Sequence, residues 1–188
     1  MKTLIQVRAT VENEIRMAFH GVTLGRGISL RQAQLADGIQ VAVRDARLAT
    51  FAEREITDDW SRVPLKELER DCIAHLDALG FRYYIPALML SVLSHYEPSS
   101  MRIIGTLAGL YPKKGNSWEF HIRRYSLLSP AQKTAIARFL MALPKLIELD
   151  YQGQKMVSRG LRNYWGEYLH TTALKGKKEK AGSSLRSG

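Results

Sequence analysis

The fold of this chain is decided by residues 81–93, which read FRYYIPALMLSVL. After Arg82 this segment carries no charge, and its apolar side chains are distributed around all sides of a helix. A helix that is apolar all round is buried in a protein core. Since proline is tolerated in the first turn of a helix, we expect a central helix that begins near Pro86 and forms the core of the fold.

The segments that flank this central helix are amphipathic. Apolar side chains in residues 64–80 repeat with the helical period, which predicts one helix over this range. Ser129-Pro130 is typical of a helix start, and Pro144 is expected to kink or end the helix that follows. A final helix is predicted over about residues 154–169.

The N-terminal part of the chain predicts shorter helices. A helix from about Val11, with Thr10 as its N-cap, is expected to end at Gly21. Ser29 is placed to cap a second helix that ends near Gly38.

Two further stretches are less regular. Residues 41–55 have only a partly apolar stripe and predict a weaker third helix. In residues 118–122 apolar and polar side chains alternate, which is compatible with a short strand or an extended edge. Together these patterns predict a mainly α, single-domain bundle of about six or seven helices over residues 1–170. Residues 171–188 are rich in Gly, Lys and Ser and predict a disordered basic tail.

The composition is that of an ordinary soluble globular protein, with 45% hydrophobic and 24% charged residues. The longest uncharged apolar run, residues 83–93, is too short to span a bilayer, which argues against integral membrane association. Cys72 is the single cysteine and no secretory leader is evident, so we expect a reducing, cytoplasmic location.

Positive charge is concentrated toward the C-terminus. The formal net charge is +10 at pH 7, of which residues 1–97 contribute −1, residues 98–170 contribute +7 and residues 171–188 contribute +4. A one-sided positive field raises the local concentration of anionic partners. Nucleic acid, an acidic protein and an anionic membrane surface are all compatible with this layout.

Three motifs follow one another along the chain, namely DDWSRVP at residues 58–64, FRYYIPALM at residues 81–89 and LSPAQ at residues 128–132. In this order the chain resembles a bacterial family of small proteins of unknown function, over roughly residues 15–145. The resemblance implies a bacterial origin and no particular reaction.

Arg82 and Tyr83 are the first candidate site. They lie where a helix is expected to begin and where backbone N–H groups are free, so they are candidates to bind an anion or a partner carboxylate. The structural alternative is that Tyr83 packs in the core and Arg82 pairs with Asp58 or Asp59. The same four residues are the candidates for a small acid–base enzyme site, although adjacent aspartates near a helix start more commonly act as caps.

Other patterns of catalytic or metal-binding residues are weak. Cys72 and His75 share one face of a predicted helix, but a cysteine in an apolar stripe usually behaves as a small buried hydrophobe. The glycine cluster of residues 21–27 lacks the Gly-Lys-Ser/Thr ending of a P-loop. We therefore assign no catalytic residue, no metal site and no cofactor.

The basic residues of the C-terminal half support the functional prediction. Cations and aromatic side chains occur together there, a mixture that suits phosphate contacts and base stacking. A solvated helix face gives the same pattern. Together with Arg82 and Tyr83, the candidate partner-binding residues are Lys113, Lys114, Arg123, Arg124, Arg159, Arg162 and Trp165.

These observations predict a non-enzymatic, intracellular bacterial interaction protein that binds an acidic macromolecule through residues 98–170. An acidic protein, such as a toxin or effector, is favoured over nucleic acid, and a small enzyme with an Asp/Arg/Tyr site is the further alternative. The prediction requires the surplus cations to gather on one exposed surface.

Overall fold

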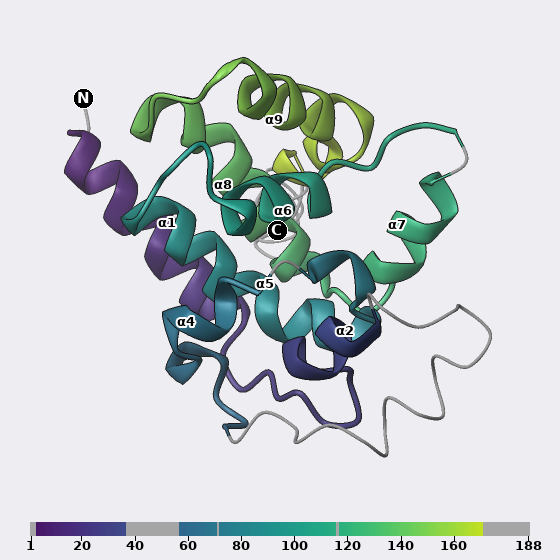
Figure 1. Ribbon diagram of the computed structural model, residues 1–188. Helices are drawn as coiled ribbons and strands as arrows, with labels where there is room; N and C mark the ends of the chain where they lie inside the picture. The colour runs from purple at the N-terminus through teal and green to yellow at the C-terminus, as the bar shows by residue number, and fades with distance from the viewer. Residues whose placement is uncertain (1–2, 37–56, 71, 116, 171–188) are drawn as a thin grey trace, which may run out of the picture.

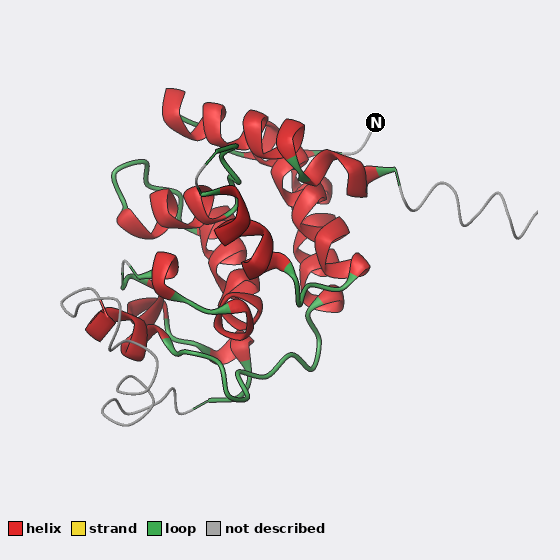
Figure 2. Ribbon diagram, turned by 90° about the vertical axis from the view of Figure 1, so that its right-hand side faces the viewer, coloured by secondary structure: helices red, strands yellow, loops and turns green. Residues whose placement is uncertain are grey.

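The fold is built from helices alone in the part of the chain that the computed structural model describes, residues 3–36, 57–70, 72–115 and 117–170 (Figure 1). Helices and loops account for all of these residues, and no strand is present among them (Figure 2). The elements in chain order are α1 (Leu4–Ala18), α2 (Leu30–Ala36), η2 (Trp60–Arg62), α4 (Leu65–Leu68), η3 (Ile73–His75), α5 (Ala78–Ser94), α6 (Met101–Gly109), α7 (Trp118–Tyr125), α8 (Pro130–Leu146), α9 (Tyr151–Asn163) and η4 (Trp165–Leu169).

Helix α5 forms the centre of the fold, as its apolar sequence predicts. It contacts α1, α6, α7 and α8, and side chains on all of its sides are buried. The helix begins two turns earlier than expected, because Asp77 caps it by accepting a hydrogen bond from the Gly80 backbone N–H at 2.8 Å. Pro86 therefore lies inside α5 and does not mark its start.

The single helix predicted over residues 64–80 is wrong. Two short helices, α4 and η3, take its place, and they bury Leu68 and Ile73, respectively. Gly80 does not end a helix but lies in the first turn of α5. A Cβ atom at this position would be 2.3 Å from the Ile28 carbonyl oxygen, so glycine is required for the close approach of these two segments.

Helices α1 and α8 pack along one another on one side of α5. Helix α1 begins earlier than predicted, because Thr3 and not Thr10 is its N-cap, in a capping box with Gln6. The start of α8 at Ser129-Pro130 is confirmed, and Pro144 lies within this helix.

The start of α2 after Ser29 is also confirmed, because the Ser29 hydroxyl accepts a hydrogen bond from the Gln32 backbone N–H at 3.1 Å. The predicted end near Gly38, the third helix over residues 41–55 and the tail over residues 171–188 lie outside the described residues.

Residues 118–122 form the first part of α7, so the predicted strand or extended edge is wrong. Five residues of alternating polarity do not distinguish a strand from a helix, whereas the spacing of apolar residues over the whole of residues 118–125 indicates a helix. Trp118, Ile122 and Tyr125 recur at helical spacing and pack inward, while Phe120 is 48% exposed. Arg124, next to Tyr125, is buried with it.

Helix α9 packs on α6 and α8 and leads into η4. It begins at Tyr151, with Asp150 as its N-cap, slightly before the predicted start near Gln154. Among the described residues, none of the helices combines the length and the apolar character needed to cross a membrane.

Candidate functional site

The basic residues of the C-terminal half do not form one continuous surface. Several are buried or already engaged with other side chains, which removes them from any docking surface. Arg102 is buried and donates to the His95 carbonyl oxygen, and Arg124 is buried against the Ala74 carbonyl oxygen. Arg138 pairs with Glu14 at 2.5 Å, and Lys133 donates to the Tyr168 hydroxyl at 3.3 Å.

Five of the remaining cations lie on two neighbouring segments, the loop after α6 and the outer side of α9. We call them the basic face: Lys113, Lys114, Lys155, Arg159 and Arg162. In the part of the chain that the structure describes, no carboxylate forms an ion pair with any of the five. The positive charge of the basic face is therefore available to a partner.

Three contacts hold the loop of the basic face against α9. The Asn163 side-chain amide donates to the Pro112 carbonyl oxygen at 3.0 Å, immediately before Lys113. Arg159 lies 3.5 Å from the Tyr111 hydroxyl. At Gly160 a Cβ atom would be 2.9 Å from the Leu110 carbonyl oxygen, so this glycine lets the two backbones approach. Cations about fifty positions apart in the sequence thus share one surface.

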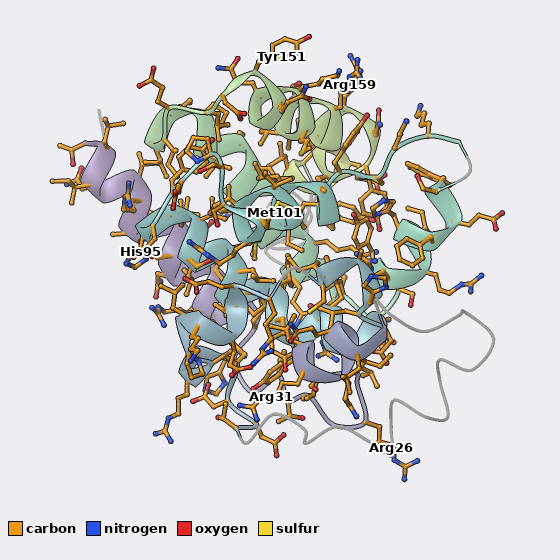
Figure 3. The ribbon with its side chains drawn as sticks, viewed as in Figure 1. Arg26, Arg31, His95, Met101, Tyr151 and Arg159 are labelled. Atoms are coloured by element: carbon orange, nitrogen blue, oxygen red, sulfur yellow. The ribbon has the colours of Figure 1, made fainter. Side chains whose placement is uncertain are left out.

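The helical period explains why the cations of α9 face outward. Gly153, Val157 and Gly160 are buried against the fold, which leaves the opposite side of the helix in solvent. Tyr151, Lys155 and Arg162 follow one another along that solvent side, and Figure 3 shows Tyr151 and Arg159 projecting outward from α9. The Lys155 ammonium lies 5.8 Å from the centre of the Tyr151 ring, which is 73% exposed.

The aromatic residues near Arg162 form part of the core. Trp165 is fully buried, and its ring centre lies 4.6 Å from that of Tyr125 and 4.8 Å from that of Tyr164. Its indole N–H donates to the Leu110 carbonyl oxygen. Trp165 was predicted to contact a partner, but its fully buried ring, with a satisfied N–H, offers no exposed surface in the described fold.

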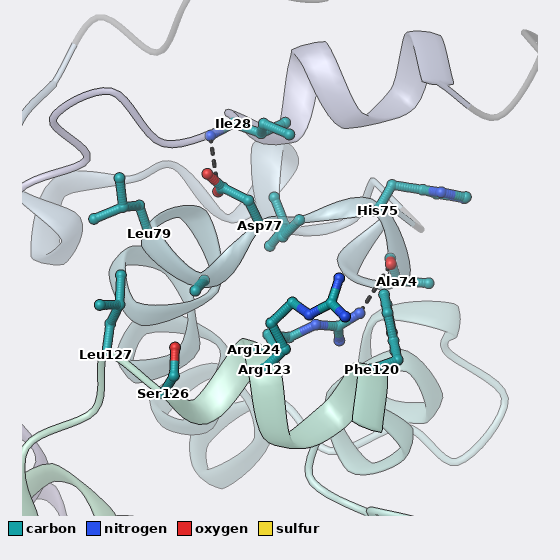
Figure 4. Close-up of a pocket in the computed structure, with 12 residues that line it drawn as sticks. Ile28, Ala74, His75, Asp77, Leu79, Phe120, Arg123, Arg124, Ser126 and Leu127 are labelled. Carbon is teal, nitrogen blue, oxygen red and sulfur yellow. Dashed lines mark hydrogen bonds between the residues drawn. The ribbon is translucent and has the colours of Figure 1, made fainter. Parts of the chain in front are cut away.

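Arg123 and Arg124 lie at a different place, on a cavity of about 560 Å³ between α7 and the turn that leads into α5. Figure 4 shows the two side chains extending side by side from α7, with Phe120 beside them. Arg123 is exposed, whereas Arg124 is 4% exposed and donates to the Ala74 carbonyl oxygen at 2.8 Å. The Arg124 guanidinium lies 4.3 Å from the centre of the Phe120 ring.

The electrostatic surroundings of Arg124 are unusual for a buried cation. No carboxylate of the described residues forms an ion pair with it, and its Nε is buried without a hydrogen-bond acceptor. Burial lowers the pKa of Arg124 from 12.5 to about 10. The guanidinium thus stays protonated at neutral pH and remains a buried positive charge.

The four residues of the alternative enzyme site do not converge. Asp58 and Asp59 line a cavity of about 340 Å³ that neither Arg82 nor Tyr83 lines. Asp59 caps η2 and pairs with Arg62 at 3.6 Å, and hydrogen bonds from Ser61 lower its pKa. Neither Asp58 nor Asp59 forms an ion pair with Arg82 in the described part of the chain, so the predicted pairing is not observed.

Tyr83 is fully buried and donates its hydroxyl to the Thr57 carbonyl oxygen at 2.6 Å. Arg82 is half-buried, and its Nε has no hydrogen-bond acceptor. The structural alternative for Tyr83, packing in the core with a tethered hydroxyl, is what the fold shows. Neither residue belongs to the basic face.

The remaining candidates for chemistry are dispersed. The Cys72 thiol is buried and donates to the Leu30 carbonyl oxygen at 3.1 Å. Cys72 precedes η3 and does not share one α-helix with His75, so the predicted common helix face is absent. Within the described ranges, no group of three or more His, Cys, Asp or Glu side chains is arranged to hold a metal ion.

Three contributing residues were not predicted from the sequence: Phe120 and Asp77, which line the cavity, and Tyr111, which contacts Arg159. Phe120 carried a signal, because it lies four positions before Arg124 and shares its helix face. Asp77 carried a weaker one, since an aspartate three residues before a glycine is compatible with a helix cap. Tyr111 carried none, because its contact depends on tertiary packing.

A family model matches residues 7–169 of this chain, and it describes a family of unknown function. The expected membership of a family of unknown function is therefore confirmed, and the match extends beyond residue 145 to include the basic face. No curated protein and no solved structure matches the chain.

Proposed function

The chain belongs to DUF6714, a family of unknown function, and we propose that it is a non-catalytic binding protein that docks an acidic protein through its basic face. One observation supports this proposal above the others. Tyr111 and Pro112, which directly precede Lys113 and Lys114, contact Arg159 and Asn163 of α9. No described carboxylate forms an ion pair with Lys113, Lys114, Arg159 or Arg162. A fixed cluster of unpaired cations gives orientation and rapid association with an acidic surface.

The surroundings of the cations favour a protein over nucleic acid as the partner. Single-stranded nucleic acid is bound by cations together with exposed aromatic rings on which bases stack. Next to Arg162 the rings of Tyr164 and Trp165 pack on each other, with their centres 4.8 Å apart, and Trp165 is fully buried. Tyr151 is the exposed ring of the basic face, and one ring is a small stacking platform.

We place this interaction in the cytoplasm of a bacterium. A single buried cysteine offers no intramolecular disulfide, which suits a reducing compartment. The bacterial assignment follows from the motif order in residues 58–132. The basic tail of residues 171–188 adds charge to the same half of the chain and is expected to strengthen the association over distance.

Fluorescence anisotropy of the full chain with two labelled probes, poly-L-glutamate and a single-stranded oligonucleotide, tests the proposal. One variant replaces Lys113, Lys114, Arg159 and Arg162 by alanine. We expect it to bind poly-L-glutamate at least about tenfold more weakly than the wild type, because several charge-assisted contacts are lost. A matched control removes the same charge from exposed residues elsewhere: Arg16, Arg26, Arg62 and Lys66.

The control variant is expected to retain most of the binding of the wild type. Equal losses in both variants would show that net charge and not the basic face determines binding, and would overturn the proposal. Tighter binding of the oligonucleotide than of poly-L-glutamate would assign nucleic acid as the partner instead. In that case the slope of log affinity against log salt concentration should become shallower in the basic-face variant, by about one unit per lost phosphate contact.

A further inference from the structure

The cavity beside α7 is distinct from the basic face and has the size of a ligand site. Its volume of about 560 Å³ lies within the range of roughly 300–1,000 Å³ that is usual for small-molecule pockets. It opens between α7 and the first turn of α5, and Asp77, Arg123 and Arg124 supply its charged groups. Figure 4 shows Leu79 and Leu127 facing one another at the end away from Phe120.

In the part of the chain that the structure describes, no carboxylate forms an ion pair with Arg123 or Arg124 of the cavity. Arg124 is 4% exposed, and it points from α7 to the Ala74 carbonyl oxygen with its Nε unpaired. The Phe120 and Phe81 rings, with centres 4.3 Å and 5.4 Å from its guanidinium, reduce the cost of burial but do not neutralise the charge. A buried cation without an anionic partner is costly, so a bound anion is expected to be stabilised here.

Among the described residues, Asp77 supplies the carboxylate of the cavity lining, and its hydrogen bonds direct it away from the two arginines. Its Oδ1 accepts from the backbone N–H groups of Ile28 at 3.0 Å and Gly80 at 2.8 Å. These bonds orient the carboxylate as the cap of α5 and not as a partner of Arg123 or Arg124. The positive end of the α5 dipole lies at the same wall and favours an anion further.

The rest of the lining is mainly apolar and sets the kind of molecule that fits. Leu76, Leu79 and Leu127 line the cavity together with Phe120. Leu127 and Phe120 are 44% and 48% exposed, so each keeps apolar surface that the core does not cover. Inorganic phosphate would leave these apolar walls in water, whereas an organic acid would cover them.

We propose that this cavity binds a small organic oxyanion, a carboxylate or a phosphate ester, whose charged head is held by Arg123 and Arg124 and whose apolar body lies on the leucine wall. Paired guanidinium groups match the planar, bidentate geometry of both head groups. Arg124 is preoriented by its bond to Ala74, and Arg123 is free to close over the ligand from the solvent side. The site is independent of the acidic protein that the basic face is proposed to dock.

NMR titration of the isotope-labelled full chain tests this inference. Benzoate and phenyl phosphate are the two probes, and they distinguish the carboxylate from the phosphate ester. Benzyl alcohol supplies the same ring without charge, and inorganic phosphate supplies the charge without the ring. We expect at least one organic anion to saturate the amide shifts of residues 120–127 and to bind about tenfold more tightly than either comparison compound.

Variants locate the binding in the cavity. Arg123→Ala is expected to weaken the organic anion about tenfold, and Arg123→Lys to restore part of the affinity, since Arg123 is exposed and its loss does not disturb the core. Leu127→Glu places a carboxylate at the apolar wall and is expected to abolish binding.

Arg162→Ala is the control, because it removes the same charge from the basic face and is expected to leave the affinity unchanged. Arg162→Ala also separates the two proposals, since any change in the affinity for poly-L-glutamate arises at the basic face and not in the cavity. Absence of saturable shifts with both organic anions would overturn the inference. So would equal affinity for benzyl alcohol, or equal losses in Arg123→Ala and Arg162→Ala.

Discussion

Trp165 donates its indole N–H to the Leu110 carbonyl oxygen at 2.7 Å, across 55 positions of the sequence. Both residues are buried, and Leu110 ends α6 immediately before the loop of the basic face. This hydrogen bond therefore fixes the loop to the segment after α9. The arrangement of cations on the surface depends on a contact inside the core.

Replacing Trp165 by phenylalanine is expected to lower the free energy of unfolding by about 2 kcal/mol, because the Leu110 carbonyl oxygen loses its donor and the smaller ring leaves a void. Chemical denaturation followed by circular dichroism measures the loss. Trp118→Phe is the matched control, since Trp118 is half-buried and its ring makes an edge contact with Tyr164. Equal losses in the two variants would show that the hydrogen bond to Leu110 adds nothing.

Glu67 accepts hydrogen bonds from Arg31 at 3.1 Å and from Arg70 at 2.8 Å, and these lower its pKa from 4.5 to about 2. Because the pKa of Glu67 is lower in the folded state, the contacts with Arg31 and Arg70 stabilise the fold at pH values above the pKa of Glu67 in the unfolded chain. This contribution is lost as pH falls toward 2. Both arginines remain partly in water, so we expect a contribution of about 2 kcal/mol at neutral pH.

Glu67→Gln is therefore expected to flatten the decline of the unfolding free energy between about pH 5 and about pH 2. Urea denaturation at a series of pH values measures this slope. Glu148→Gln, at an exposed position, is the control and should keep the slope of the wild type. An unchanged slope in Glu67→Gln would show that the Arg31–Glu67–Arg70 contacts do not contribute to stability.

Gly80 and Gly109 both lie in helices, where alanine is intrinsically favoured by about 1 kcal/mol. At Gly80 a Cβ atom would be 2.3 Å from the Ile28 carbonyl oxygen, which is backbone and cannot move away cheaply. At Gly109 the nearest atom is the Ile73 Cγ2 at 3.3 Å, on a side chain that can shift. Gly80→Ala is expected to lower the free energy of unfolding by more than about 3 kcal/mol, and Gly109→Ala by less than about 1 kcal/mol. Thermal or chemical unfolding measures both losses.

The sequence predicted the elements that depend on local patterns and on burial. The all-round apolar sequence of residues 81–93 identified the core helix, and Ser29 and Ser129 identified two helix starts, because a cap is a local interaction. It failed where tertiary contacts choose between similar local structures. Asp77 is a helix cap because its carboxylate also meets the Ile28 backbone N–H, and no periodicity in residues 64–80 contains that contact.

The sequence predicted the candidate site only in part, again because tertiary contacts are not visible in a local pattern. Charge along the sequence identified Lys113, Lys114, Arg159 and Arg162, but it could not show that Arg124 and Trp165 point inward while their neighbours point outward. That distinction depends on the phase of α7 and η4 relative to the core. A one-residue step along α7 separates exposed Arg123 from buried Arg124, which a charge count treats as equal.

His121 provides a last test, because it reports on Arg124 directly. Burial, and then repulsion by the Arg124 charge, lowers the pKa of His121 from 6.5 to about 4, and its Nδ1 lies 3.4 Å from the Tyr125 hydroxyl. The neutral ring is favoured in the folded state, so stability is full above about pH 6.5 and declines as pH falls toward 4. NMR titration of the His121 ring signals should give a midpoint near 4. A saturating organic oxyanion in the cavity should move that midpoint upward, because it offsets the Arg124 charge. A midpoint that does not respond to the bound anion would mean that the anion does not neutralise Arg124.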